Sequence, residues 1–152
     1  MSTHPLENLL NNENLDKVVA DCVELVRQEV SSKRGLSGTI IKGGLKVIEK
    51  LKPNMLDALF YSLLPSFVEK LKPLHERFNN ENEQGSRQFN SYLQKHAVEV
   101  ASLLLTVTDE RAEKSKLGAL VSIYRKLRPM AQEQIVSAVP SLAQLLAKHG
   151  IK

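Results

Sequence analysis

The sequence predicts an all-α fold, and two features carry that prediction: an aliphatic composition with few aromatic residues, and apolar residues that recur with the helical period. Of the 152 residues, 42% are hydrophobic but only 5% are aromatic, with seven glycines and no tryptophan. Leu and Ala favour helices, and no stretch alternates apolar and polar residues for long enough to predict a strand. A chain of this length is expected to form a single domain, 1–152.

An internal repeat predicts how this domain is organised. "KLKPNMLDALFYSLLPSF" begins at Lys50 and "KLRPMAQEQIVSAVPSL" begins at Lys126; each contains a basic run, a proline, an apolar stretch and a Pro-Ser pair. A spacing of half the chain is what a duplicated gene would leave. We therefore expect two similar three-helix units, 15–78 and 89–150, packed about a pseudo-two-fold axis and separated by a polar linker, 79–88.

The prolines of the repeat predict where its helices begin and bend. Pro129 follows Pro53 by 76 residues, whereas Pro140 follows Pro65 by 75 residues. Inside an unbroken helix this slip would rotate everything after it by about 100°, so a break near the prolines is expected to absorb it. Pro53 and Pro129 are interpreted as first-turn prolines, and Pro65 and Pro140 as kinks or new starts within each third helix.

The helices of the first unit follow from the spacing of apolar residues. These recur at three- and four-residue steps from Leu15 to Val30, which predicts one helix. The segment "SSKRGLSG" is expected to end it, because glycines interrupt helices and Ser37 or Thr39 can cap the next one. A second helix is predicted over 39–51. The third segment is apolar on nearly every side and is expected at the centre of the domain.

The second unit is expected to repeat this pattern. Apolar residues from Phe89 to Val107 predict its first helix. Thr108, followed by Asp109 and Glu110, resembles an N-cap with an acidic first turn. A new helix is therefore predicted to begin there.

The clearest polar feature is a pair of basic stretches. Six Lys or Arg residues and one acid lie between Lys33 and Lys52, and the same counts recur between Arg111 and Arg128. They indicate either a surface for nucleic acid or anionic phospholipid, or the solvated face that any amphipathic helix needs. The absence of interleaved aromatic residues favours the solvated face. The candidate anion-binding residues are Lys42, Lys46, Lys50, Arg125, Lys126 and Arg128.

The glycine-rich segment "KRGLSGTIIKGG" precedes and opens the predicted second helix. Its backbone could hold an anion at the helix N-terminus, but it lacks the G-x-x-x-x-G-K-[ST] spacing of a phosphate-binding loop. Turn formation and packing explain it better. Gly43 and Gly44 would let a neighbouring helix approach closely.

No local pattern predicts catalysis or metal binding. His4, His75, His96 and His149 are scattered and form no metal-ligand motif. The single cysteine, Cys22, lies on the apolar side of the first helix and is interpreted as a small core residue rather than a reactive thiol. We therefore expect no catalytic residues, no cofactor and no metal, in a protein that is not an enzyme.

The cellular location is predicted from hydropathy and cysteine content. No stretch reaches the roughly 18 uncharged apolar residues of a membrane-spanning helix. A lone cysteine cannot form an internal disulfide, so nothing in the chain requires an oxidising compartment. These features predict a cytoplasmic protein without a transmembrane segment.

Several separated motifs resemble those of a known family. "RGLSGTIIKGG", "VTDERAEKSK", "YRKLRPMA" and "VPSLAQLL" together are similar to a family of small, all-helical bacterial proteins of unknown function. The resemblance extends from about Val18 to Lys148. It implies a bacterial cytoplasmic origin and a helical fold, and it offers no catalytic residues to transfer.

Three functions are compatible with these features. The first is a non-enzymatic module that self-associates or docks a protein partner through an apolar groove between its halves, with Phe60, Leu64 and Phe67 as the candidate groove residues. The second is polyanion binding through the basic stretches, with nucleic acid as the weaker candidate partner. The third is a small apolar ligand held between the two repeats.

Overall fold

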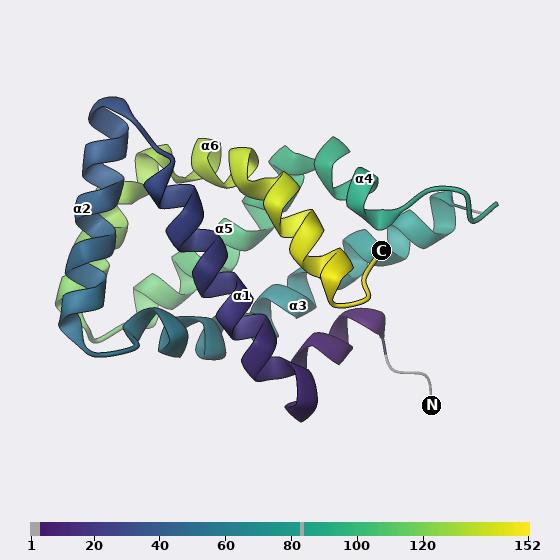
Figure 1. Ribbon diagram of the computed structural model, residues 1–152, viewed down its shortest axis with the longest axis horizontal. Coiled ribbons are helices and arrows are strands. Elements are labelled where there is room, and N and C mark those ends of the chain that lie inside the picture. Colours follow the sequence, from purple (N-terminus) through teal and green to yellow (C-terminus); the bar gives the residue numbers. More distant parts are fainter. Residues whose placement is uncertain (1–3, 83) are drawn as a thin grey trace.

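The computed structural model describes residues 4–82 and 84–152, and nearly all of these residues are helical (Figure 1). No strand occurs among them, so the predicted all-α class is confirmed. One 3-10 helix and six α-helices follow one another along the described chain: η1 (Pro5–Leu10), α1 (Asn12–Ser31), α2 (Gly35–Leu51), α3 (Met55–Glu81), α4 (Phe89–Lys95), α5 (Ala97–Lys114) and α6 (Gly118–Lys148).

The helices form a bundle with two unlike ends (Figure 1). α2 stands at one end, packed across the N-terminal part of α6, while η1, α4 and the C-terminus lie at the other. Between them α5 packs against α3 and α6, and α1 packs against α3. The C-terminal tail closes the second end, because the Phe89 N–H donates to the Lys152 carbonyl over 2.7 Å.

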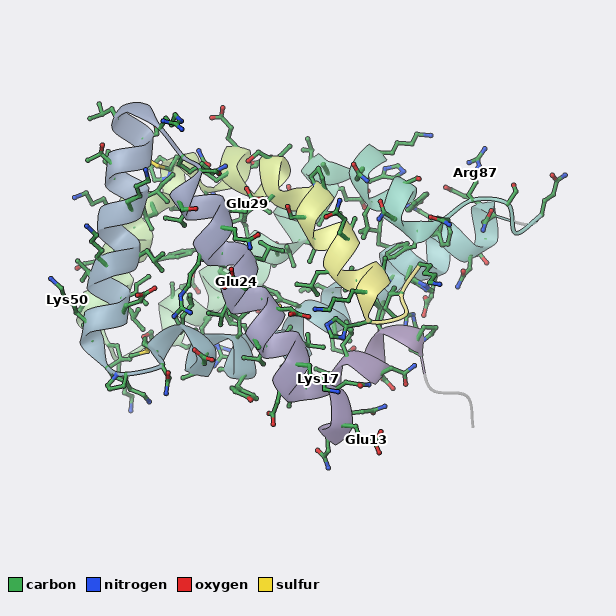
Figure 2. The ribbon with its side chains drawn as sticks, in the orientation of Figure 1. Glu13, Lys17, Glu24, Glu29, Lys50 and Arg87 are labelled. Carbon is green, nitrogen blue, oxygen red and sulfur yellow. The ribbon has the colours of Figure 1, made fainter. Side chains whose placement is uncertain are left out.

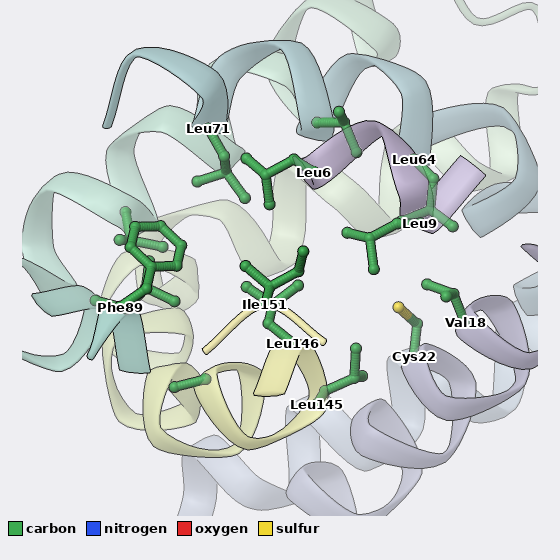
Figure 3. Close-up of a cluster of buried hydrophobic side chains, with 14 of the residues drawn as sticks. Leu6, Leu9, Val18, Cys22, Leu64, Leu71, Phe89, Leu145, Leu146 and Ile151 are labelled. Carbon is green, nitrogen blue, oxygen red and sulfur yellow. The ribbon is translucent and has the colours of Figure 1, made fainter. Parts of the chain in front are cut away.

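The buried core is concentrated away from α2. Side chains from η1, α1, α3, α4 and α6 converge there, and Ile151 of the C-terminal tail lies among them (Figure 3). Leu6 and Phe89 are 0% exposed, whereas the only buried residue of α2 is Gly38. Apolar burial stabilises a domain in proportion to the area removed from water. The core end therefore holds the fold together, and α2 covers the opposite end more loosely.

The two repeat prolines lie in different environments, which corrects the prediction that both occupy a first helical turn. Pro53 lies in the turn between α2 and α3, followed by Asn54 in the left-handed conformation (φ 61°). Pro and then Asn suit such a turn. Pro129 instead lies inside α6, where Met130 stands in place of the asparagine. Methionine has no local hydrogen bond to favour the left-handed region, so the helix continues.

As a consequence, the second half of the chain does not contain separate second and third helices. α6 runs for 31 residues through Pro129 and Pro140, and α3 contains Pro65 and Pro73 within its 27 residues. Figure 1 shows α6 changing direction along its length, as expected where prolines remove backbone hydrogen bonds. The two halves thus differ in their boundaries, and the internal duplication with pseudo-two-fold packing stays a prediction.

None of the predicted N-caps is correct, because Ser37, Thr39 and Thr108 all lie inside helices. Thr108 lies inside α5, where its hydroxyl donates to the Leu105 carbonyl over 3.2 Å. Thr39 lies inside α2 and donates in the same way to the carbonyl of Gly35, the first residue of that helix, over 3.1 Å. A threonine hydroxyl can be satisfied by a carbonyl three or four residues earlier, so it need not mark a helix start.

Two further boundaries differ from the prediction. The helix expected from Phe89 to Val107 is interrupted at His96, which separates α4 from α5. The helix α3 extends through Glu81, so the first part of the predicted linker 79–88 is helical. In the connection that follows, the Asn82 side chain closes the loop by accepting from the Arg87 N–H over 3.0 Å; residue 83 lies outside the described residues.

Candidate functional site

The apolar sides of α1, α3 and α6 meet around a cavity rather than a filled core. We call it the central cavity; its volume is about 340 Å³. The three helices supply neighbouring wall residues at the three- and four-residue steps that place side chains on one helix face. Its lining includes Cys22, Val26, Phe60, Leu64, Phe67 and Ala138.

The structure brings all three candidate groove residues into the wall of this cavity. Phe60, Leu64 and Phe67 follow one another at steps of four and three residues along α3, so they share one face of that helix. Leu64 is buried, whereas both phenylalanines are half-buried and border the cavity. The exposed wall is almost wholly apolar, so the site can hold a ligand through dispersion and hydrophobic contact.

One polar atom in the cavity wall has no partner. The Oε1 atom of Gln134 is buried and makes no hydrogen bond to any described residue. The hydroxyl of Thr108, which also borders the cavity, is already engaged with the Tyr124 hydroxyl at 2.7 Å. A buried carbonyl oxygen without a donor destabilises the fold by about 1–3 kcal/mol.

A polar cluster joins α1 to α6 at the edge of the cavity, near the labelled Glu29 in Figure 2. Lys33 Nζ lies 3.6 Å from the Glu29 carboxylate and donates to the Ser137 hydroxyl over 3.0 Å. The Ser141 hydroxyl donates to Glu29 over 2.9 Å. These bonds span two helices and hold the cavity walls together, while both charged side chains remain partly in contact with water.

Cys22 borders the cavity but is not poised as a nucleophile. Burial, followed by the nearby Asp21 carboxylate, raises the pKa of the Cys22 thiol to about 12. The thiolate is the reactive form of cysteine, so this thiol stays protonated at neutral pH. Cys22 therefore acts as a small apolar wall residue, in agreement with its interpretation from the sequence.

Five of the six candidate anion-binding residues are exposed, on α2 and α6, and the sixth is paired with an acid. Lys42, Lys46 and Lys50 are exposed on α2, and Figure 2 shows Lys50 pointing away from the bundle. Arg125 and Lys126 are exposed on α6. Arg128 differs from the other five because an acidic residue binds its guanidinium.

Asp109 is the partner of Arg128. The Nε atom of Arg128 lies 2.9 Å from one Asp109 carboxylate oxygen, and its Nη2 atom lies 3.2 Å from the other. These bonds, and then a hydrogen bond from Tyr124, lower the pKa of Asp109 below its ordinary value. Burial, and then the same carboxylate, raises the pKa of Tyr124 to about 12. Arg128 is therefore part of a structural network between α5 and α6 rather than a free anion site.

Two of the histidines, His4 and His75, lie next to each other, whereas His149 bonds to an acid on another helix. His75 is buried, with its ring 4.7 Å from that of Phe89 and 5.1 Å from that of His4. Burial, and then the neighbouring His4, lowers the pKa of His75 below its ordinary value. His149 lies just after α6 and bonds to Asp21 over 2.7 Å. Burial alone would raise the pKa of Asp21, but hydrogen bonds from His149 and Lys148 lower it.

No group of three or more His, Cys, Asp or Glu side chains within residues 4–82 and 84–152 is arranged to hold a metal ion. In the same part of the chain, no helix combines the length and the hydropathy needed to cross a membrane.

Sequence reasoning missed two polar residues of the cavity. Gln134 lies four residues before Ala138 and eight before Leu142, so it interrupts an apolar stripe of α6. That interruption was the available signal. Thr108 could not be recognised because its position next to two acids resembles an N-cap, and only the structure shows that α5 continues past it.

Comparison with known proteins identifies the family but not its activity. A family model described as "Family of unknown function (DUF6918)" matches residues 6–150. The match covers nearly the whole chain, so the chain belongs to this family, which confirms the resemblance seen in the motifs. No significant match was found among curated proteins or among solved structures.

Proposed function

We propose that this member of the DUF6918 family is a non-enzymatic binding protein that holds a small, largely apolar molecule in the central cavity. The observation that carries the proposal is the cavity itself, about 340 Å³ with an almost wholly apolar wall. Ligand sites in proteins usually have volumes of roughly 300–1,000 Å³ and apolar linings with few polar groups.

The apolar wall of the cavity favours an apolar occupant over water. The cavity is partly open to solvent, so water can contact this wall when no ligand is bound. A bound apolar molecule would remove that surface from water, which contributes roughly 25 cal/mol per Å² of apolar area.

The volume of the cavity distinguishes a small molecule from a protein segment. A helix with its side chains is about 10–12 Å across, so even a short helical segment needs a longer and wider groove. Phe60 and Phe67 of α3 form one part of the cavity wall, and residues of α1 and α6 form other parts. The cavity is thus bordered by three helices. A compact ligand fits this enclosure better than a partner helix does.

The direct test uses a neutral fluorescent probe, N-phenyl-1-naphthylamine, whose emission rises in apolar surroundings. Ala138→Trp places a large side chain in the cavity, whereas Ala20→Trp places the same side chain on the exposed surface of α1. We expect wild type and Ala20→Trp to bind the probe with equal affinity. The affinity of Ala138→Trp for the probe should be lower by a factor of about ten or more. If a folded Ala138→Trp variant binds as tightly as wild type, the central cavity is not the site.

Native mass spectrometry of the protein purified gently from its own host gives an independent test. A mass above 17.0 kDa by a few hundred daltons is expected, which corresponds to one retained ligand. A mass of two chains would instead support self-association, which stays a prediction. A bacterial origin, a cytoplasmic location and polyanion binding through the α2 lysines also stay predictions.

A further inference from the structure

A second concave surface, which we call the basic groove, lies beside the central cavity and shares Thr108 with it. Its volume is about 680 Å³, and it opens between α3, the C-terminal turns of α5 and the N-terminal turns of α6. Ile48 of α2 closes one side. The apolar floor includes Leu59, Leu63, Val107, Leu120 and Val121.

The rim of this groove is positively charged. Arg111, Lys114 and Lys116 line it together with a single carboxylate, Glu110, so the lining carries three cations against one acid. Within residues 4–82 and 84–152, no carboxylate lies within ion-pair distance of any of these three cations. Their charges are therefore available to a ligand, in contrast to that of Arg128.

Arg111 is also held in place. Its Nη1 atom donates to the Ser62 hydroxyl over 2.6 Å, and its Nη2 atom donates to the Ser62 carbonyl over 3.1 Å. A guanidinium has five N–H donors, so several remain for a second acceptor. Because Ser62 belongs to α3 and Arg111 to α5, the guanidinium is positioned where the apolar floor meets the rim. A fixed guanidinium loses less conformational entropy on binding than a free side chain does.

We propose that the basic groove binds an anionic amphiphile. The apolar chain of the ligand lies along the floor formed by α3, α5 and α6, and its carboxylate or phosphate end contacts Arg111 and the two rim lysines. Hydrogen bonds between a guanidinium and such an anion are charge-assisted and stronger than neutral ones. The site is separate from the central cavity, so this inference does not rest on the proposed function.

Both parts of the groove are needed to identify this class of ligand. A multiply charged, fully hydrated polyanion would satisfy the rim but would leave the apolar floor in contact with water and phosphate. A neutral apolar molecule would cover the floor but gain nothing from the three cations. Only a molecule with an apolar chain and one anionic end matches the floor and the rim together.

The test compares three ten-carbon probes by isothermal titration calorimetry: decanoate and decylammonium below their critical micelle concentrations, and 1-decanol below its solubility limit. The head group is the only difference, so the comparison isolates the charge. A charge-assisted hydrogen bond contributes enough to raise affinity about tenfold or more. We expect decanoate to bind at least that much more tightly than 1-decanol, and decylammonium to bind more weakly than either.

Charge variants then locate the anionic end. In the variant Arg111→Gln, Lys114→Gln, Lys116→Gln, the affinity for decanoate is expected to fall about tenfold or more, with that for 1-decanol unchanged. The control Lys42→Gln, Lys46→Gln, Lys50→Gln removes the same charge from α2 and is expected to leave decanoate binding within about twofold. If the first variant fails to fold, the double variant Lys114→Gln, Lys116→Gln can replace it, because it retains the bonds between Arg111 and Ser62. Its affinity for decanoate is also expected to be lower than that of wild type.

Three results would overturn the proposal. First, decanoate could bind no more tightly than 1-decanol. Second, the triple substitution on α2 could lower the affinity for decanoate as much as the triple substitution in the groove does. Third, the cavity variant Ala138→Trp could abolish decanoate binding, which would place the amphiphile in the central cavity instead. Retained decanoate binding in Ala138→Trp, with loss of the neutral naphthylamine probe, would show that the two sites are distinct.

A last experiment tests whether the groove binds a single amphiphile or the surface of a membrane. Vesicles of phosphatidylglycerol present the same anionic chemistry as a bilayer, whereas decanoate presents it as a single chain. We expect the monomeric probe to bind and decanoate to reduce any vesicle binding. Binding to vesicles without measurable binding of decanoate would contradict the groove proposal and indicate a general electrostatic surface.

Discussion

The core end of the molecule, formed by η1, α4 and the C-terminal parts of α3 and α6, buries large apolar side chains, whereas the α2 end leaves several of them exposed. At the core end, Leu6, Phe89 and Leu93 are completely buried. At the α2 end, Leu36 is 80% exposed and Val47 is 45% exposed. The central cavity extends between the two ends, because Leu9 of η1 and Ile41 of α2 both line it, and the basic groove borders α2 through Ile48.

This contrast separates stability from binding within one small domain. The core end buries most of the large apolar side chains, so it supplies most of the hydrophobic stabilisation. The α2 end leaves apolar surface uncovered inside the cavity and the groove, where a ligand can reach it. Substitutions at the two ends should therefore affect different measurements.

The largest expected difference comes from removing one aromatic ring at each end. Phe89→Ala deletes a fully buried ring and should lower the free energy of unfolding by about 3–5 kcal/mol. Phe60→Ala deletes a ring that already borders a cavity, so fewer contacts are lost and the decrease should be roughly half as large. Urea unfolding measures both. Phe60→Ala should in addition weaken binding of the neutral naphthylamine probe, and equal losses of stability at both sites would contradict the contrast.

A smaller, pH-dependent effect is expected at the core end, where His75 is buried. Its pKa is lowered in the folded state relative to the ordinary value of 6.5, so the unfolded chain takes up this proton more readily. Stability is therefore retained above about pH 6.5 and falls as the pH drops below it, by at most about 1.4 kcal/mol per pH unit for one proton.

The variant His75→Phe keeps an aromatic ring among Phe78 and Phe89 but removes the titrating group. Urea unfolding at pH 7.5 and pH 5.5 should show a smaller loss for this variant than for wild type. The same loss in both would assign the pH dependence to other groups. Asp21 and Asp109, whose pKa values are lowered, should contribute only at more acidic pH, because carboxylates with lowered pKa values destabilise the fold when they become protonated.

The smallest effect concerns two adjacent glycines in α2. A Cβ atom added at Gly43 meets nothing within 4 Å, whereas one added at Gly44 lies 3.1 Å from the Leu127 Cδ1 atom of α6. Gly43→Ala should therefore stabilise the protein by about 0.5–1 kcal/mol through helix propensity alone. Gly44→Ala should gain less or lose stability, because Leu127 has to move. Equal gains in urea unfolding would show that α2 does not pack closely on α6.

These glycines also show how far sequence reasoning reached. Gly43 and Gly44 were both expected to let a neighbouring helix approach closely. Adjacent residues of a helix point to different sides, and the sequence of α2 does not say which side faces α6. The same limit applies to the prolines. Pro53 and Pro129 stand in similar local sequences, yet only Pro53 lies in a turn, since Asn54 accepts a left-handed conformation there.

For the candidate site, the sequence was informative about apolar residues and poor about polar ones. Phe60, Leu64 and Phe67 could be selected because helical spacing alone places them on one face of α3. Arg128 could not be separated from Arg125, because its pairing with Asp109 joins two helices. Arg111 belongs to a predicted basic stretch, but its anchoring by Ser62 depends on the packing of α5 against α3.

What the sequence determined by itself is therefore local: the helical class, the apolar side of each helix with Cys22 on it, and membership of the family. These follow from the side chains and their spacing along a single segment. The central cavity, the unpartnered Gln134 and the free charges of the basic groove were decided only by the tertiary structure. A cavity is the space that several helices fail to fill, and no single segment contains that information.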